Sequence, residues 1–170
     1  EIQMVAPVDL EFDSLYFGGG TPSVLMPKQI ETIMSAVFRN FSFLPDLEIN
    51  LEVNPGSTDR EKLISYRKTG INRMTIGAQS FDDHNLGFLR RIHTSAEARQ
   101  TIAWVREAGF DHLGLDLIYG LPEQSRDDWV GDMRTAVSFD PEHLSCYMLT
   151  VEPGTPLHTD VRCGRVRPAG

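Results

Sequence analysis

Two hydrophobic patterns alternate along the chain. Short segments in which apolar and polar residues alternate are separated by longer segments in which apolar residues recur every three or four positions. The short segments predict β-strands at residues 14–17, 48–53, 71–77, 112–118 and 143–150. The longer segments predict helices, and no linker or low-complexity stretch interrupts the series. This alternation indicates parallel β/α units, arranged either as a β/α barrel or as a doubly wound sheet.

Start and stop signals bracket the predicted helices. Pro27 suits a first helical turn and opens a stripe of apolar residues. Gly70 and Gly109 offer left-handed ends to two later helices, and a further short helix is expected at residues 84–90. The capping-box pattern, a hydroxyl residue followed three positions later by an acid, occurs at Thr58 and Glu61, Thr94 and Glu97, and Ser125 and Asp128.

The two faces of the predicted strands distinguish the barrel from the doubly wound sheet. Apolar side chains share one face, and polar residues or glycine occupy the other, in residues 48–54, 73–79 and 112–117. A central strand of a doubly wound sheet has helices on both faces and reads as a nearly continuous apolar run. The pattern therefore favours a barrel whose lumen, hydrated or filled by a ligand, faces Glu52, Gln79 and Asp116. A sheet with one face in solvent is the alternative.

The carboxyl ends of the strands, where a β/α barrel carries its active site, hold a ring of polar and glycine residues. Three glycines directly after a strand let backbone amides approach a ligand, and consecutive amides bind a carboxylate. A tight turn into the helix at Pro27 is the alternative explanation of the glycines. Neither the dinucleotide nor the P-loop fingerprint is present. The ring consists of residues 18–22, Glu52, Asn54, Gln79, Asp116 and residues 147–150.

Glu52 and Asp116 are the two carboxylates of this ring, and both suit ribose hydroxyls or an amino group. A salt bridge to Arg73 is the alternative for Glu52. Asp116 lies within an apolar strand, where an unpaired acid is costly to bury, so we expect it to have a functional role. His93, in contrast, is expected to cap a helix or lie at the surface.

Composition narrows the classes of function. The net charge of −8 at pH 7 argues against a nucleic-acid partner. The sequence has no apolar run of membrane-spanning length, and its first residues lack the charged and apolar regions typical of a signal peptide. Two cysteines fit a reducing cytoplasm, and we expect Cys146 to be a small buried apolar residue. Because the chain starts at Glu1 and residues 161–170 show no closing element, we expect an internal fragment of a longer protein.

Five segments, taken together, carry a family resemblance. They are Tyr-Phe-Gly-Gly-Gly-Thr-Pro-Ser at 16–23, Glu-Val-Asn-Pro at 52–55, Ile-Gly-Ala-Gln-Ser-Phe at 76–81, Arg-Ile-His at 91–93, and Asp-Leu-Ile-Tyr-Gly-Leu-Pro at 116–122. These segments occur in order along nearly the whole chain. Together they resemble the radical S-adenosylmethionine (SAM) proteins of the oxygen-independent coproporphyrinogen III oxidase family. A later segment, residues 143–156, is similar to the HemW branch of that family, whose members are regarded as haem chaperones.

The resemblance implies an incomplete β/α TIM-type barrel of the radical SAM class, with parallel strands and outer helices. A [4Fe-4S] cluster and SAM would meet at its C-terminal face. The residues that the resemblance assigns to cofactor binding are Gly19, Gly20, Thr21, Glu52, Gln79, Arg91, Asp116 and Thr150. The first three match the motif that holds the methionine moiety. The last four match positions around a second SAM in the oxidase branch.

The chain departs from the family at the cluster. The three cysteines of the family, spaced C-x3-C-x2-C, are absent, so the cluster ligands are expected outside this chain, and no metal ligands are expected within it. The chain alone should therefore be inactive. On this interpretation, residues 1–158 are the central part of the barrel domain without its first strand and cluster loop. Residues 159–170 are then the truncated start of the C-terminal region.

Three functions remain open. The first is a HemW-like cytoplasmic haem chaperone that, when full-length, binds the cluster, SAM and haem or a porphyrin, with a haem-acceptor protein as possible partner. The second is a coproporphyrinogen III oxidase that decarboxylates propionate side chains through a 5'-deoxyadenosyl radical. The third, independent of the resemblance, is an ordinary barrel enzyme that binds a small anionic metabolite at the glycines and needs no iron–sulfur cluster.

Overall fold

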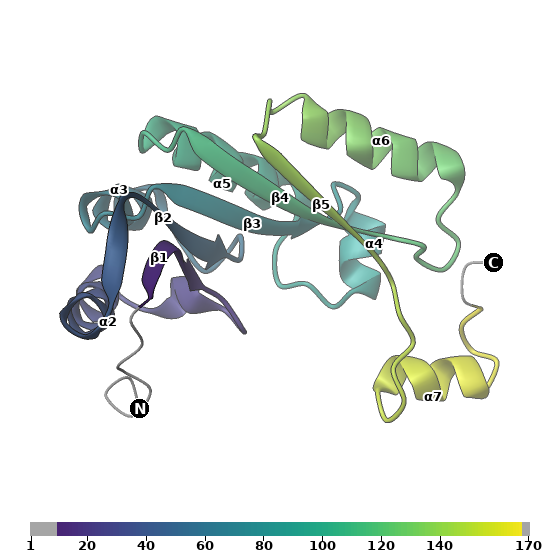
Figure 1. Cartoon of the computed structure of the whole chain (residues 1–170). Helices are drawn as coiled ribbons and strands as arrows, with labels where there is room; N and C mark the ends of the chain where they lie inside the picture. Colours follow the sequence, from purple (N-terminus) through teal and green to yellow (C-terminus); the bar gives the residue numbers. More distant parts are fainter. Residues whose placement is uncertain (1–9, 168–170) are drawn as a thin grey trace.

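Five parallel strands form a curled half-barrel in the computed structural model, which describes residues 10–167 (Figure 1). In hydrogen-bonding order they are β1 (Glu11–Phe17), β2 (Ser42–Val53), β3 (Arg73–Gln79), β4 (His112–Tyr119) and β5 (His143–Met148). The spatial order follows the sequence without a reversal, so the sheet is wound in one direction. A doubly wound sheet would reverse its order at a switch point. The predicted incomplete TIM-type barrel is therefore confirmed.

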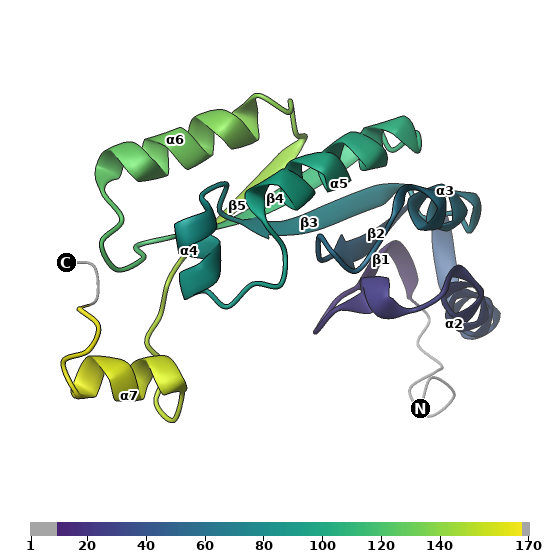
Figure 2. The ribbon, with the colours of Figure 1, turned by 180° about the vertical axis from the view of Figure 1, so that it is seen from behind.

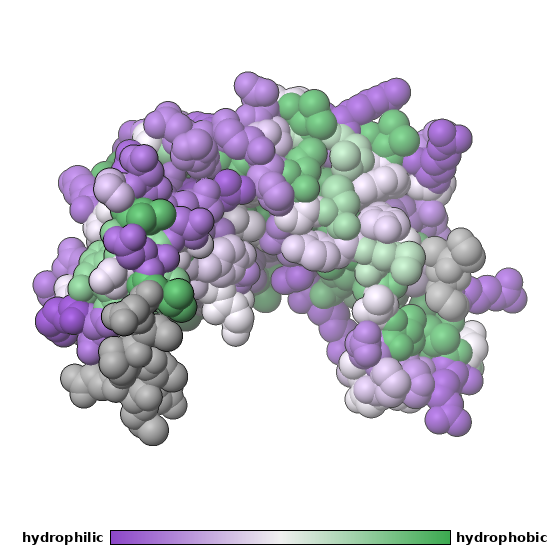
Figure 3. Space-filling view, in the orientation of Figure 1, coloured by the Kyte–Doolittle hydropathy of each residue, from purple (hydrophilic) through white to green (hydrophobic). Residues whose placement is uncertain are grey.

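Helices surround the curled sheet, and the whole molecule forms an arch (Figures 1 and 2). They are a short 3-10 helix η1 (Pro22–Val24), α2 (Pro27–Asn40), α3 (Arg60–Lys68), α4 (Asp83–Phe88), α5 (Ser95–Glu107), α6 (Arg126–Val137) and α7 (Pro156–Arg162). Helix α2 lies at one end of the arch, and α7 stands away from the sheet at the other end. The space-filling view shows the hollow between these two ends (Figure 3).

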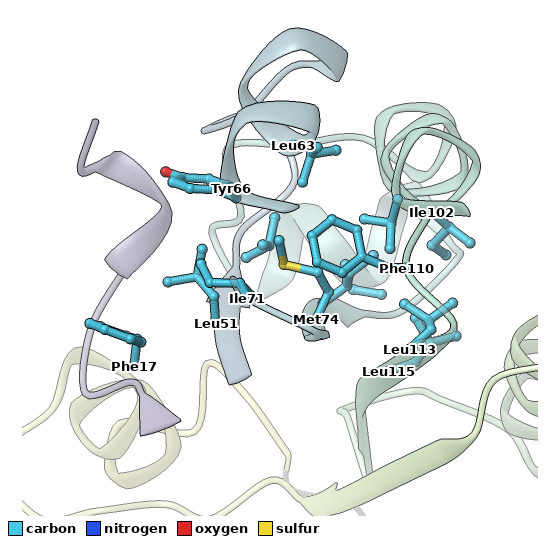
Figure 4. Packing of buried hydrophobic residues seen from close by; sticks show 14 of the residues in the cluster. Phe17, Leu51, Leu63, Tyr66, Ile71, Met74, Ile102, Phe110, Leu113 and Leu115 are labelled. Atoms are coloured by element: carbon cyan, nitrogen blue, oxygen red, sulfur yellow. The ribbon is translucent and has the colours of Figure 1, made fainter. Parts of the chain in front are cut away.

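The apolar core lies on the outer face of the sheet, between the strands and α2, α3 and α5. Tyr66 and Leu63 of α3 and Ile102 of α5 point towards the strands (Figure 4). The strand residues that they cover are fully buried, namely Leu51, Met74, Ile76, Leu113 and Leu115. These are the apolar positions of the alternating pattern, so the predicted assignment of the two strand faces is confirmed.

Helix starts follow local capping chemistry, as predicted for α5 and α6. The hydroxyl of Thr94 accepts a hydrogen bond from the amide of Glu97 at 3.2 Å, and the hydroxyl of Ser125 accepts one from the amide of Asp128 at 3.1 Å. In both cases the acidic side chain in turn accepts a hydrogen bond from the amide of the capping residue. Two otherwise unpaired amides are satisfied at each helix start, which fixes where the helix begins.

The predicted start of α3 is wrong by one residue. The cap is Asp59, whose carboxylate accepts from the amide of Lys62 at 2.8 Å, and not Thr58. Aspartate is the better N-cap acceptor of the two, because its side chain is a charged acceptor and threonine is a weaker cap. At the other end of this helix, Gly70 has the predicted left-handed conformation, with φ +105°.

Cys146 is exposed, so the prediction of a buried apolar residue is wrong. It lies on β5, an edge strand of the sheet, where residues are half-buried or exposed. The Cys146 thiol lies 3.8 Å from the sulfur of Met133 on α6, which covers that end of the sheet only in part. An edge strand pairs with one neighbour and is covered less completely than a central one, which the sequence pattern did not reveal.

The proposed division at residues 158 and 159 stays a prediction, and this boundary falls within α7. The outermost parts of both predicted domains, residues 1–9 and 168–170, lie outside the described residues. None of the helices described between residues 10 and 167 is long and apolar enough to cross a membrane.

Candidate functional site

One cavity of about 170 Å³ lies at the carboxyl ends of the strands, on the inner face of the sheet. It receives residues from the loop after β1, from β2, β3 and β4, and from the segment between α4 and α5. Its lining is Gly20, Thr21, Glu52, Val53, Asn54, Thr75, Gly77, Gln79, Arg91 and Asp116. Six of the eight residues predicted to bind the cofactor are thus brought together from positions almost 100 residues apart in the sequence.

The other two predicted residues lie outside this lining. Gly19 precedes Gly20 in the same loop and has a left-handed backbone with φ +82°. Thr150 is exposed and follows the end of β5, which stops at Met148. The cofactor-binding roles assigned to all eight residues remain predictions.

The glycine loop packs closely against the cavity wall at Gly18. A Cβ atom at this position would overlap the ring of Tyr16 and lie 3.0 Å from Oε1 of Glu52. Only glycine leaves room for these two side chains to meet above the loop. The loop therefore does more than connect β1 with α2, because its first glycine permits a polar contact at the cavity.

Hydrogen bonds to the buried Ser23 anchor the other end of the glycine loop. The Ser23 hydroxyl lies 2.6 Å from that of Ser57 and accepts from the amide of Asn54 at 3.1 Å. Its carbonyl accepts from Nζ of Lys62 at 2.6 Å and from the hydroxyl of Tyr66 at 3.1 Å. Burial lowers the pKa of Lys62. Helix α3 and the residue that follows β2 thus hold this end of the loop in place.

Glu52 is paired with a tyrosine and not with Arg73. The hydroxyl of Tyr16 donates to Oε1 of Glu52 at 2.7 Å, whereas Arg73 pairs with Glu48 at 3.2 Å. The predicted alternative of a Glu52–Arg73 salt bridge is therefore wrong. Burial, followed by the bond to Glu52, raises the pKa of Tyr16 well above its ordinary value. Tyr16 was not among the predicted site residues, although it lies on β1 only two residues before Gly18, and residues two apart along an extended chain face the same side.

Asp116 is half-buried on β4 and shares the cavity with Glu52. Burial raises the pKa of Asp116, a hydrogen bond with Ser145 opposes this shift, and the charge of Glu52 adds to it. Among the residues described, Asp116 and Glu52 form no salt bridge. Asp116 and Thr75 also line a second hollow of about 320 Å³ on the same face of the sheet. The lumen is therefore polar and carries negative charge.

Arg91 brings positive charge to the same cavity. Burial lowers the pKa of Arg91, but a guanidinium stays protonated in proteins. Within residues 10–167 it forms no salt bridge. A half-buried guanidinium that shares a cavity with two carboxylates, none of them in a salt bridge among the described residues, suits a ligand that carries charges of both signs.

His93 is buried, with 2% of its surface exposed, so the expectation of a capping or surface role is wrong. Its Nε2 donates to the carbonyl of Ala78 at 3.2 Å, and its Nδ1 lies 3.1 Å from Oδ1 of Asn54. Burial lowers the pKa of His93. The ring thereby joins the ends of β2 and β3 and fixes the segment that carries Arg91. Burial of the His93 ring depends on residues distant in the sequence, so the Arg-Ile-His motif was the only sequence signal for its role.

The described residues do not fit an iron–sulfur cluster. No three His, Cys, Asp or Glu side chains in residues 10–167 lie close enough together to hold a metal ion. The two cysteines of the chain, Cys146 and Cys163, are both exposed and free. The sequence contains no C-x3-C-x2-C motif.

The chain is similar to a protein family, to individual relatives in sequence, and to solved structures. Residues 1–136 match the family described as the Radical SAM superfamily. The heme chaperone HemW of Escherichia coli is 39% identical over 145 residues, which is 85% of this chain and 38% of that protein. The mouse protein named radical S-adenosyl methionine domain-containing protein 1, mitochondrial, is 36% identical over 152 residues, covering 89% of this chain and 34% of its own length.

A solved structure shares the fold. Coproporphyrinogen III oxidase (HemN) from Escherichia coli, described as a radical SAM enzyme, superposes with a TM-score of 0.76 at 31% identity. The match covers 84% of this chain and 33% of HemN. The chain thus spans little more than a third of the length of these relatives. The match to the Radical SAM superfamily, which covers most of the chain, implies SAM and a [4Fe-4S] cluster as the cofactors of the family. The chain belongs to the radical SAM superfamily.

Proposed function

We propose that the protein to which this chain belongs binds SAM in the cavity at the carboxyl ends of the strands. The observation that carries this proposal is that the cavity combines the positive charge of Arg91 with the negative charges of Glu52 and Asp116, none of which forms a salt bridge within residues 10–167. SAM carries a carboxylate, an ammonium and a sulfonium group. The guanidinium and the amides of the glycine loop suit its carboxylate, while the acids suit its ammonium or ribose hydroxyls.

The cavity is also preorganised, because hydrogen bonds within the chain hold its lining in place. The Lys62 and Tyr66 bonds to Ser23 fix the glycine loop, and His93 fixes the segment that carries Arg91. Side chains held by their own hydrogen bonds lose little freedom on binding, which favours affinity. A [4Fe-4S] cluster bound elsewhere in the full-length protein would supply the electron that cleaves SAM. We expect the 170-residue chain alone to show no cluster spectrum after reconstitution.

For the whole protein we propose the role of a cytoplasmic haem chaperone, which binds haem or a related porphyrin and passes it to an acceptor protein. The relatives named heme chaperone HemW support this role, with 35–39% identity over most of this chain. The alternative is oxidative decarboxylation of coproporphyrinogen III, supported by the 31% identity to HemN. The third possibility, an ordinary barrel enzyme without a cluster, has no support from the superfamily match.

Two measurements on the full-length protein with a reduced cluster separate these roles. Haem titration followed by absorbance should reveal saturable binding. Incubation with SAM and coproporphyrinogen III should leave the propionate side chains intact. Formation of the decarboxylated product would overturn the chaperone role and establish the oxidase. Failure to bind haem, with no product, would contradict both.

A further inference from the structure

Gln79 reaches the cavity through an unusual backbone conformation. It is the last residue of β3 and has φ +69°, a left-handed value that residues other than glycine adopt rarely. The amide of Ser80 donates to the carbonyl of Ala78 at 2.9 Å, which closes a tight three-residue turn around Gln79. Such conformations persist only where the surrounding structure fixes them, and they gather at functional sites.

The turn changes where the Gln79 side chain lies. The pairing of β3 with β4 shifts register between Ile76 and Gln79, so the strand end departs from regular alternation. The Gln79 side chain folds back over Gly77, where a Cβ atom would lie 2.8 Å from its Nε2. Only 8% of Gln79 is exposed, and it lines the cavity. The position of its amide therefore depends on the turn being held in this form.

Asp132 holds that turn from the outer side of the barrel. It lies on α6, 53 residues beyond Gln79, and only 4% of it is exposed. Its Oδ2 accepts from the hydroxyl of Ser80 at 2.6 Å, and its Oδ1 accepts from the amide of Phe81 at 2.8 Å. Both donors belong to the two residues that directly follow Gln79. One carboxylate thus fixes the backbone on the far side of the turn.

Ser80, Asp82, Asn85 and Asp132 form one hydrogen-bonded cluster, and its other bonds restrain the same segment. The hydroxyl oxygen of Ser80 accepts from the amide of Asp82 at 3.1 Å and from Nδ2 of Asn85 at 3.3 Å. Burial of a carboxylate is unfavourable unless its oxygens are hydrogen-bonded, and here both oxygens of Asp132 are. Asp132 does not line the cavity, so the cluster serves the turn and has no direct contact with a ligand there.

We propose that Asp132 is a positioning residue for the cofactor cavity: through Ser80 and Phe81 it holds the left-handed turn that directs the amide of Gln79 towards SAM. This role rests on the proposed SAM binding and adds a residue outside the cavity to it. An outer helix of the barrel thereby controls an inner-face ligand contact.

A double-mutant cycle on the full-length protein with its reconstituted cluster tests this role. The measured quantity is the dissociation constant for SAM, obtained by calorimetric titration. Asp132→Ala should weaken binding about tenfold, the loss expected for roughly one hydrogen bond. Gln79→Asn shortens the amide but keeps a residue that tolerates the left-handed conformation, and it should weaken binding by a similar factor. Asp127→Ala on the exposed side of α6 is the matched control and should bind as the wild type does.

The double variant distinguishes positioning from general destabilisation. If Asp132 acts through Gln79, Asp132→Ala should add less than about twofold in the Gln79→Asn background, because coupled residues are not additive. Asp132→Asn keeps an acceptor for the Phe81 amide and should restore part of the affinity. Exchange of the Phe81 amide with solvent should accelerate in Asp132→Ala but not in Asp127→Ala. If Asp132→Ala fails to fold, Ser80→Ala replaces it in the same cycle.

Two results would overturn the role of Asp132 while leaving SAM binding intact. One is wild-type affinity in a folded Asp132→Ala variant, and the other is losses that multiply fully in the double variant. If the wild-type protein with its cluster bound no SAM, the proposed function would fail, and the role of Asp132 in it would fail too.

Discussion

The two faces of the curled sheet differ sharply in chemistry, although the same strands form both. On the outer face, Leu51, Met74 and Leu115 are fully buried under the helices. On the inner face, their immediate neighbours Glu52, Thr75 and Asp116 line polar cavities. Successive strand residues point to opposite sides, so one sequence segment serves two purposes.

Because of this difference between the two faces, neighbouring strand residues serve different purposes: one stabilises the fold and the next lines the ligand cavity. The outer face stabilises the fold through burial of apolar surface and close packing. The inner face carries charges that find no ion-pair partner among residues 10–167, and their burial opposes folding. Substitutions one residue apart should therefore change different properties of the protein.

The largest effect is expected on the outer face. Leu115→Ala removes a fully buried side chain from the core on β4 and should lower the free energy of unfolding by about 2–5 kcal/mol. Chemical denaturation measures this loss. Leu10→Ala, at a residue that is more than half exposed, is the matched control and should change stability by less than about 0.5 kcal/mol. A small loss at Leu115 would mean that the outer face is not the core.

Asp116→Asn, one residue further along, should lower SAM affinity and not the stability of the fold. Losing a half-buried carboxylate should weaken SAM binding by about tenfold, the effect of one hydrogen bond from a charged group. It should leave stability unchanged or raise it at neutral pH, because burial raises the pKa of Asp116. Calorimetric titration and denaturation of the same samples measure the two effects.

The pH dependence of that stability difference has a definite sign. An acid with a raised folded pKa holds its proton more tightly in the folded state than in the unfolded state. The wild type should therefore lose stability relative to Asp116→Asn as pH rises from the ordinary aspartate pKa through the raised one. Below the ordinary aspartate pKa the difference should no longer change with pH, because the carboxyl is then protonated in both states. A difference that grew towards low pH would contradict the direction of the shift.

Tyr16→Phe should have a smaller effect. It removes the hydroxyl that donates to Glu52 at 2.7 Å and leaves the ring in place. Stability should change by no more than about 1 kcal/mol, the net contribution of one hydrogen bond. SAM affinity should fall several-fold, because Glu52 loses the group that orients it. Tyr147→Phe, which removes a hydroxyl from another exposed tyrosine of the inner face, provides the comparison, and equal losses at both would argue against a specific role for Tyr16.

The smallest effect is expected for a substitution of Cys146, and its size tells an exposed cysteine from a buried one. Because this residue is exposed on the edge strand, Cys146→Ser should change the free energy of unfolding by less than about 0.5 kcal/mol. A buried cysteine would cost more, since a hydroxyl would replace an apolar group in the core. Thiol labelling under native conditions should reach both exposed cysteines, and more slowly at Cys146, because partial burial and the charge of Asp116 raise the pKa of its thiol.

Regular local patterns allowed most of the fold to be predicted. Alternation fixed which face of β2, β3 and β4 is apolar, and capping residues such as Thr94 and Ser125 marked helix starts. The glycine run and the acids at strand ends placed most of the cavity lining, because parallel strands bring their carboxyl ends to one edge. These features depend on neighbours in the sequence or on a rule common to the whole fold.

Contacts between distant segments escaped prediction. His93 is buried because the ends of β2 and β3 supply its partners Asn54 and Ala78, which no local pattern indicates. Asp132 looked like any acid on a helix, and its partners lie more than 50 residues earlier. Cys146 was misjudged because an apolar residue in a strand reads the same at an edge as at the centre.

The most direct test of the central claim is a SAM titration of the full-length protein carrying its cluster, comparing the wild type with Glu52→Gln. This substitution keeps the shape of a cavity side chain and removes its charge. We predict saturable binding by the wild type, at least about tenfold weaker binding by the variant, and equal unfolding midpoints. Equal SAM affinity in the two proteins would contradict the assignment of the inner-face cavity as the cofactor site.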